Sequence, residues 1–390
     1  MKNCMLRITA YFASLTVASC LCDGVRAQVT QDAPGKSMAA VLQPFVDSHT
    51  LAGAVTLVAT ADKVLSVDAV GYADIVAGRP MRTDCLFWIA SQSKPITAAA
   101  LMILVDEGHV CVDDPVEKYL PEFQGQWVKV EQDQDHMLLR KPKHAITVKN
   151  VLTHTSGLPF KSPIEEPTLD LLPLAARVRS YAMLPLDFEP DAKYQYSNAG
   201  INTAGRIIEV VSGMPFEEFL AKRLLEPLGM KDTTFWPNAD QLARLAKSYQ
   251  PCADGKSLEE TTITQLKYPL DDGVRQPMPA GGLFSTAADL CSFYRMLAAG
   301  GVYEGRRILS EQAVRQMTSK QTGDLGDEYG FGFATGSGKI GHGGAYSTNS
   351  CYDRNRQLIM IFLVQHAGWP GDGAKILPAF QAAAAEAFGH

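Results

Sequence analysis

Segments rich in β-branched residues lie near both ends of this 390-residue chain, whereas the residues between them follow mostly helical patterns. Residues 53–60 and 64–72 are two such segments, and the short connection between them suits a β-hairpin. Near the C-terminus, residues 339–340, 346–352 and 358–364 are also predicted strands. Because strands and helices do not alternate along the chain, we predict an α+β fold, in which N- and C-terminal segments form one antiparallel sheet flanked by helices.

The middle of the chain is predicted to be a mostly helical region, about residues 91–274, inserted between the two parts of the sheet region, about residues 38–90 and 275–390. The polar segment 124–144 lacks helical periodicity and is predicted to be a loop or a small hairpin. Helical patterns occur at residues 38–48, 95–107, 147–153, 202–212, 216–225, 286–299, 310–318 and 374–387.

The start of the chain has the pattern of a secretory signal peptide. Lys2 and Arg7 precede an apolar run that ends in small residues, so we predict a signal peptide over residues 1–27 and a mature chain over residues 28–390. A buried N-terminal helix is the alternative interpretation. The sequence before Cys20 also resembles a bacterial lipobox, and lipidation there would attach the protein to a membrane. We therefore expect an exported protein, either periplasmic or secreted.

Charge and cysteine spacing exclude several classes of partner. The net charge of −6 and the lack of any Lys/Arg block argue against nucleic-acid binding. The cysteines after residue 27 form no C-x-x-C pair, so we predict no metal site, no cofactor and no particular disulfide, and we expect buried free thiols. They are Cys85, Cys111, Cys252, Cys291 and Cys351.

Ser91 and Lys94 lie at the start of the predicted helix 95–107. Residues three apart share one face of a helix, so the lysine amine can reach the serine oxygen and take its proton. The pattern alone is weak, because roughly one Ser-x-x-Lys is expected by chance in a chain of this length. A surface lysine at a helix start is the alternative. The absence of G-x-S-x-G and H-E-x-x-H argues against an α/β-hydrolase and a zincin.

Two further motifs, Tyr196-Ser197-Asn198 and His342-Gly343-Gly344, follow Ser91-Gln92-Ser93-Lys94 along the chain. With these motifs the chain resembles the class C β-lactamase, DD-peptidase and family VIII carboxylesterase group of penicillin-recognising serine hydrolases, over residues 38–388. Other stretches similar to that group are residues 152–158, 226–230, 280–283 and 329–332.

The resemblance implies a β-lactamase/transpeptidase-like fold and one serine hydrolase domain over residues 28–390, which works through an acyl-enzyme. Ser91 would be the nucleophile, Lys94 its base and Tyr196 a second proton-transfer group. Asn198 would lie on the same extended loop as Tyr196 and donate a hydrogen bond to a substrate carbonyl. The alternative for Asn198 is a structural residue at a helix entrance.

The third motif would border the other side of the pocket. The resemblance implies that His342, Gly343 and Gly344 lie on a strand at its edge, where the glycines let the substrate approach the backbone. The amides of Ala345 and Ser91 would then form the oxyanion hole.

At positions 342 and 343 the chain departs from the β-lactamase pattern. Many β-lactamases have a lysine where His342 stands and a hydroxyl residue where Gly343 stands, and these residues hold the substrate carboxylate. We therefore predict small esters or amides without a carboxylate as substrates, although Ser347 or Thr348 could compensate. A β-lactamase, a D-alanyl-D-alanine carboxypeptidase or a non-catalytic penicillin-binding sensor are the alternatives. His154 is predicted to be a structural helix-end residue.

Overall fold

The computed structural model describes residues 37–389. The predicted signal peptide lies outside the described residues, and so do both of its alternative fates, cleavage after Ala27 or lipidation at Cys20. Within the described range, no helix is both long enough and apolar enough to cross a membrane.

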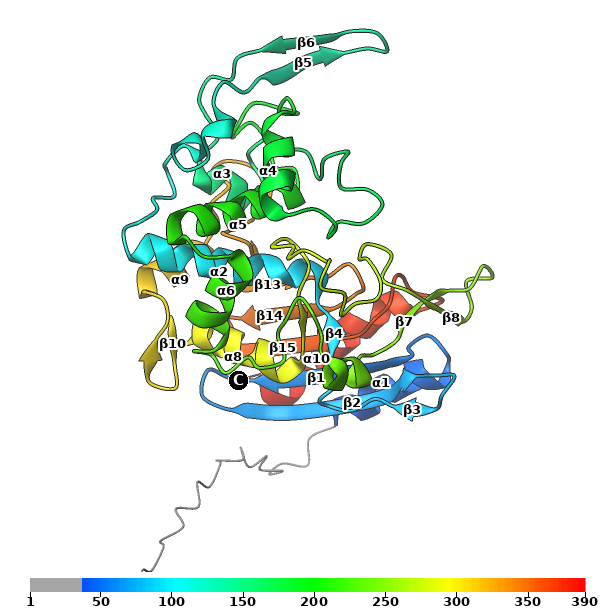
Figure 1. Ribbon diagram of the computed structural model, residues 1–390. Coiled ribbons are helices and arrows are strands. Elements are labelled where there is room, and N and C mark those ends of the chain that lie inside the picture. The colour runs from blue at the N-terminus through cyan, green and yellow to red at the C-terminus, as the bar shows by residue number, and fades with distance from the viewer. Residues whose placement is uncertain (1–36, 390) are drawn as a thin grey trace, which may run out of the picture. The chain divides into compact units, whose positions relative to one another are not determined.

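A seven-stranded antiparallel sheet lies at the centre of the fold (Figure 1). Its strand order is β12-β13-β14-β15-β1-β2-β3, so β1 from the N-terminal part pairs directly with β15 from the C-terminal part. The strands are β1 (Gly53–Ala59), β2 (Val64–Asp74), β3 (Arg79–Pro80), β12 (Ala334–Gly336), β13 (Lys339–Gly343), β14 (Asn349–Asp353) and β15 (Leu358–Leu363). The predicted α+β fold is confirmed, as is the assembly of one sheet from both ends of the chain.

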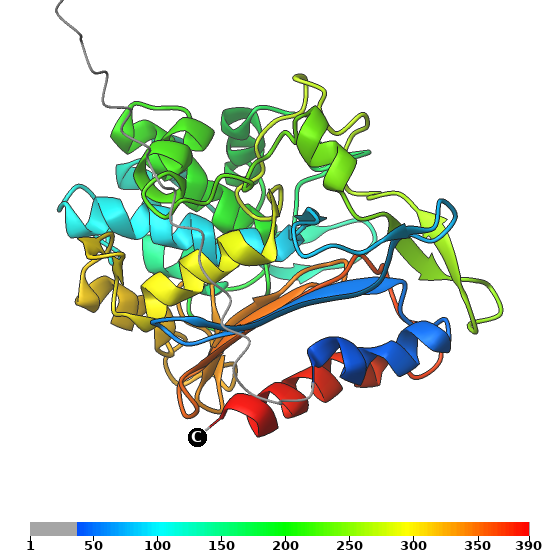
Figure 2. The same cartoon turned by 90° about the horizontal axis from the view of Figure 1, so that it is seen from below.

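Helices cover both faces of this sheet (Figure 2). On one face, α1 (Met38–Asp47) and α10 (Ile376–Phe388) share a core with Ala54 and Val58 of β1. On the other face, Val55 and Leu57 belong to a larger core that includes α2 (Ser93–Asp106) and α8 (Ala287–Ala298). Successive side chains of a strand point to opposite faces, so the two layers together bury every residue of β1.

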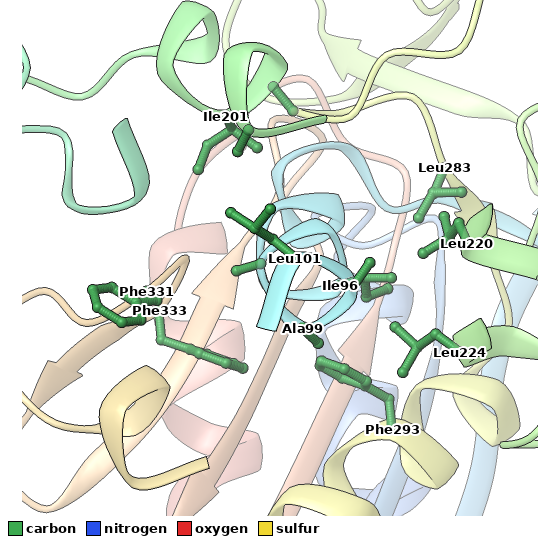
Figure 3. Packing of buried hydrophobic residues seen from close by; sticks show 14 of the residues in the cluster. Ile96, Ala99, Leu101, Ile201, Leu220, Leu224, Leu283, Phe293, Phe331 and Phe333 are labelled. Atoms are coloured by element: carbon green, nitrogen blue, oxygen red, sulfur yellow. The ribbon is translucent and has the colours of Figure 1, made fainter. Parts of the chain in front are cut away.

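Apolar side chains from several elements pack around helix α2 (Figure 3). Every residue from Ser93 to Leu104 is buried, as expected of a helix that is apolar all round. Ile96, Ala99 and Leu101 are surrounded by side chains of several other elements, among them Ile201, Leu220, Leu224, Phe293 and Phe333. Packing from all sides fixes this helix in place, and with it the motif at its N-terminal end.

The remaining helices of the described range lie mostly between the two parts of the sheet region. They are α3 (Val148–Thr153), α4 (Leu174–Ala182), α5 (Asn198–Ser212), α6 (Phe216–Leu220), α7 (Ala239–Arg244) and α9 (Glu311–Thr318), with a π-helical turn at Ala221–Leu225 and 3-10 turns at Ala90–Gln92, Val116–Lys118, Pro121–Phe123 and Gly373–Lys375. Most of the predicted helices are confirmed to within a few residues, whereas α4 and α7 were not predicted.

Short strand pairs lie outside the main sheet. The polar segment 124–144 contains a hairpin that projects from the helical region, so the hairpin interpretation of this segment is confirmed (Figure 1). The pairs are β5 (Val128–Gln132) with β6 (Met137–Arg140), β7 (Ser248–Pro251) with β8 (Leu258–Thr261), β4 (Phe87–Trp88) with β9 (Phe284–Ser285), and β10 (Val302–Tyr303) with β11 (Arg306–Arg307). Only the first of them was predicted.

The predicted strand 346–352 is wrong at its start, because β14 begins at Asn349. The residues before it form a tight turn, in which the Gly344 N–H donates to the Thr348 carbonyl at 2.7 Å. Ser347 adopts a φ of 65°, a left-handed conformation that a strand cannot contain. This turn carries the chain from β13 to β14.

The cysteines of the described residues are all free thiols, as expected, but they are not all buried. Cys85, Cys291 and Cys351 are buried, whereas Cys252 is half-buried and Cys111 is exposed. Cys111 lies in the loop that follows α2, between the buried Val110 and Val112.

Candidate active site

Ser91 lies in the 3-10 turn Ala90–Gln92, which leads directly into α2. Lys94 lies one helical turn further on, and its Nζ is 3.0 Å from the Ser91 Oγ. The Lys94 side chain is fully buried. The structure thus brings the predicted nucleophile and its predicted base into hydrogen-bond contact.

Two carbonyl oxygens also contact the Lys94 amine. Its Nζ lies 2.8 Å from the Asn198 Oδ1 and 2.8 Å from the Ala280 carbonyl oxygen. A neutral amine has two N–H bonds and one lone pair, whereas an ammonium has three N–H donors. If the two carbonyls accept the two N–H bonds of a neutral amine, the lone pair is left for the Ser91 hydroxyl proton.

Burial favours this neutral form. Desolvation lowers the pKa of Lys94 well below the ordinary lysine value, because the charged form loses its hydration in the interior. The surface-lysine alternative for Lys94 is therefore wrong.

Tyr196 lies just before α5, beside the serine and the lysine. Its ring faces Lys94, with the Nζ 4.6 Å from the ring centroid. Burial raises the pKa of Tyr196 above the usual tyrosine value, and a hydrogen bond with Ser91 has the opposite, smaller effect. The phenol is therefore protonated at neutral pH and is placed to give up or relay a proton close to the Ser91 Oγ.

Asn198 is the first residue of α5, so its predicted place on an extended loop is wrong. The helix begins here because the Ser197 Oγ caps it, accepting a hydrogen bond from the Gly200 N–H at 3.1 Å. The Asn198 Oδ1 accepts from Lys94, and the amide nitrogen of the same side chain is the group that could donate to a substrate. The alternative, that Asn198 is a structural residue at a helix entrance, is correct for its backbone. The Asn198 side chain nevertheless belongs to the site, because it contacts Lys94.

His342 lies on β13, across the site from Ser91. Its Nδ1 is 2.6 Å from the Gly343 carbonyl oxygen and therefore carries the proton, so its Nε2 is an acceptor. That Nε2 is 3.1 Å from the Tyr329 hydroxyl and 3.5 Å from the Tyr196 hydroxyl. Burial lowers the pKa of His342 to about 3, because the charged ring would lose its hydration. His342 is thus neutral at neutral pH and offers no positive charge.

The two glycines after His342 have different surroundings. A Cβ on Gly344 would lie 2.6 Å from the Ile89 carbonyl oxygen, so only glycine allows β13 to approach the turn that holds Ser91. A Cβ on Gly343 would have no heavy atom nearer than 3.7 Å, so the fold tolerates a side chain there. Gly344 is therefore required by close packing, whereas Gly343 is not.

The close approach at Gly344 brings the end of β13 beside the turn that holds Ser91. Within residues 37–389, the amide of Ala345 donates no backbone hydrogen bond. The predicted oxyanion hole, made of the Ala345 and Ser91 amides, requires this proximity and an unoccupied N–H.

Comparison with known proteins identifies the family. A family model described as Beta-lactamase matches residues 38–385. The chain belongs to the beta-lactamase family. It is 34% identical over 366 residues to Protein Rv1367c of Mycobacterium tuberculosis, a match covering 84% of this chain and 89% of that protein. It is also 28% identical over 369 residues to Esterase EstB of Burkholderia gladioli, with the same two coverages.

Solved structures agree with the beta-lactamase fold. The structure of EstCE1, described as a hydrolase with promiscuous acyltransferase activity, superimposes with a TM-score of 0.73 at 23% identity. The match covers 89% of this chain and 97% of that one. Membership of this family of serine hydrolases supports the prediction, made from the sequence motifs, that the protein is a hydrolase.

Some residues of this beta-lactamase-family site were not given a role from the sequence. The Ala280 carbonyl and the Tyr329 hydroxyl belong to stretches that were noted only as similar to the family. His154 ends α3 with a left-handed φ of 61°, which confirms its predicted helix-end position. It is also a support for the site, because its Nδ1 accepts from the Ser197 N–H at 3.2 Å and its ring centroid lies 4.6 Å from that of Tyr196.

The described residues contain no group of three or more His, Cys, Asp or Glu side chains arranged to bind a metal ion.

Proposed function

We propose that the protein is a serine hydrolase that forms an acyl-enzyme at Ser91 and acts on small esters or amides that lack a carboxylate near the scissile bond. The observation that carries this proposal is the environment of Lys94: a buried amine, contacted by two carbonyl oxygens and by the Ser91 Oγ. That arrangement suits a base that is neutral before reaction.

Acylation would proceed by one bond forming and one breaking. The Ser91 Oγ bonds to the substrate carbonyl carbon while its proton moves to the Lys94 Nζ. The bond from that carbon to the leaving oxygen or nitrogen then breaks, and the leaving atom receives a proton through Lys94 and Tyr196. Water then bonds to the acyl carbon and gives a proton to Lys94 and Tyr196. The bond from that carbon to the Ser91 Oγ breaks, the pair passes the proton to the Oγ, and the acid is released.

The neutral state of His342 supports substrates without a carboxylate. β-Lactams and D-alanyl-D-alanine peptides carry a carboxylate that a fixed cation stabilises, and here the ring at position 342 has a pKa of about 3. The relative named as an esterase, EstB, matches along most of its length and favours the same reading.

A substrate panel with detection of the covalent intermediate tests the proposal. We expect p-nitrophenyl acetate or butyrate to be turned over faster than a chromogenic cephalosporin or a D-Ala-D-Ala peptide. Intact-mass spectrometry should show an acyl adduct that Ser91→Ala lacks. If neither turnover nor an adduct occurs with any substrate, the hydrolase proposal is wrong, and faster turnover of the carboxylate-bearing substrates would contradict the substrate preference.

Restoring a cation and a hydroxyl should shift this preference. We expect the double variant His342→Lys/Gly343→Thr to raise kcat/KM for the cephalosporin about tenfold, since a charge-assisted hydrogen bond is worth about 1.5–3 kcal/mol. The space around Gly343 accommodates the new side chain. The control His342→Lys/Gly343→Ala keeps the cation and lacks the hydroxyl, so it should gain less. An unchanged cephalosporin rate in both variants would show that positions 342 and 343 do not set the preference.

A further inference from the structure

A small cavity adjoins the site beside Tyr196 and His342. We call it the tyrosine pocket; its volume is about 270 Å³, and its walls include Tyr194, Tyr196, Tyr329, His342, Asp327 and Glu328. The rings stand at angles to one another, with the centroids of Tyr194 and Tyr329 5.6 Å apart and their planes 48° apart. Aromatic walls of this kind attract cations through the negative faces of the rings.

Two carboxylates face this pocket without a cationic partner. Asp327 and Glu328 are exposed, and neither forms an ion pair within residues 37–389. Burial raises the pKa of Tyr194 to about 12, and the charge of Asp327 contributes to the increase. The negative charge therefore acts on the aromatic wall itself.

No cation among the pocket walls balances these carboxylates. His342 is neutral at neutral pH because its pKa is about 3. Lys94 does not line the pocket; it is fully buried and contacts the ring of Tyr196. The pocket therefore combines aromatic faces, net negative charge and a volume suited to a small group, which together fit a cation and disfavour an anion.

The position of the pocket indicates which part of a substrate it would hold. One wall is Tyr196, the residue proposed to pass a proton to the leaving group, and another is His342 with Gly343 at the end of β13. An ester bound at Ser91 with its leaving oxygen near Tyr196 would direct the rest of its alcohol toward this cavity.

We propose that the tyrosine pocket binds an alkylammonium group on the alcohol part of the substrate, so that the preferred substrates are esters of amino alcohols of the choline type. This inference rests on the proposed acyl-enzyme function and deepens it by naming the substrate class. Acylation of Ser91 then releases the amino alcohol, with the proton on its oxygen supplied through Lys94 and Tyr196.

A pair of esters of equal shape tests the proposal. Butyrylcholine carries a charged trimethylammonium group where 3,3-dimethylbutyl butyrate carries a neutral tert-butyl group, and the two esters are otherwise the same. We expect kcat/KM to be about tenfold higher for the choline ester, as cation–π and carboxylate attraction at a partly exposed site imply. In the double variant Asp327→Asn/Glu328→Gln, this ratio should fall to between one and three.

Asp324→Asn is the control for the loss of one negative charge and is compared with the single variant Asp327→Asn, because Asp324 is exposed in the same loop and does not line the pocket. It should leave the ratio close to the wild-type value. A ratio near one in the wild-type protein, or a ratio that falls equally in Asp324→Asn, would overturn the proposal.

Binding of tetramethylammonium, measured by calorimetry on Ser91→Ala, tests the pocket without turnover. We expect saturable binding that weakens about tenfold in the variant that also carries Asp327→Asn/Glu328→Gln. Absence of saturable binding overturns the ammonium site even if p-nitrophenyl esters are hydrolysed. Binding in a protein that hydrolyses no ester would support the site and refute the proposed function.

Discussion

Replacing Lys94 with methionine is expected to reduce kcat/KM for a p-nitrophenyl ester by about 10³-fold, within the 10²–10⁴-fold range of general acid–base catalysis. Methionine fills a similar volume and leaves the Ser91 hydroxyl without an acceptor for its proton. Initial rates of p-nitrophenol release by the purified variant and the wild-type protein measure the effect. Lys231→Met is the control, because Lys231 is exposed and lies outside the site.

The pH dependence separates a neutral base from a structural lysine. If Lys94 acts as the neutral amine, kcat/KM rises with pH through its pKa and then levels off. Burial lowers that pKa, so the plateau should begin well below the pH at which an exposed lysine loses its proton. A profile that falls as pH rises through the same range would show that the charged form of Lys94 is required.

The same lysine should leave a signature in stability. Between its lowered pKa and the ordinary lysine value of about 10.4, the unfolded chain holds a proton on Lys94 that the folded protein does not. The free energy of unfolding of the wild-type protein should therefore rise with pH over this window, relative to that of Lys94→Met. Urea unfolding of both proteins at pH 7 and pH 9 measures the difference, and equal slopes would contradict a neutral Lys94.

Replacing Asp170 with alanine is expected to lower the free energy of unfolding by about 3–5 kcal/mol, the usual cost of removing one partner of a buried ion pair. The Asp170 Oδ2 accepts from the Arg275 Nε at 2.7 Å, and the two side chains are 1% and 2% exposed. Without Asp170, a buried guanidinium loses its counter-charge. Urea denaturation measures the loss, and Asp135→Ala, at an exposed carboxylate, should change stability by less than about 0.5 kcal/mol.

The double variant Asp170→Leu/Arg275→Met tests the cause. Because it removes both charges, it should recover a large part of the loss, as replacement of buried ion pairs by apolar side chains often does. Arg275 also donates to the carbonyl oxygens of Phe235 and Leu270, so some loss should remain. A cost below about 1 kcal/mol in Asp170→Ala would show that the pair contributes little.

The sequence predicted those elements whose pattern is set by the apolar core. The β-branched runs of β1 and β15 are buried along their whole length, and such runs are recognisable without knowing their partners. Helix α2 was predictable for the same reason. The contact between Ser91 and Lys94 was predictable from local spacing alone, because residues three apart lie on one face of a helix.

Elements shaped by buried polar groups were missed. The helix α4 has a fully buried Arg177, whose guanidinium donates to the Leu169 and Pro277 carbonyl oxygens. A buried charge obscures the apolar face on which a helix prediction depends. The hairpin of β7 and β8 is mostly polar and half-exposed, so it also lacks a hydrophobic period.

Within the site, the sequence identified motifs but not contacts between them. Helix α5 begins where the Ser197 side chain caps it. This start places the Asn198 side chain in contact with Lys94. The walls of the tyrosine pocket include Tyr194 together with Asp327 and Glu328, which are far from it along the sequence. No spacing rule joins such residues, because only the tertiary fold brings their loops together.

The pairing of β1 with β15 has a consequence for how the chain acquires its structure. Residues opposite one another in this pair, such as Val55 and Leu363, are separated by most of the polypeptide. In a chain interrupted before β15, one edge of β1 has no partner strand. In the complete chain, bringing β15 to β1 closes a loop of about 300 residues, which costs entropy before any contact compensates for it. Topologies dominated by such distant contacts fold slowly. The central sheet therefore depends on nearly the whole chain being available, and the last strands made are those that complete it.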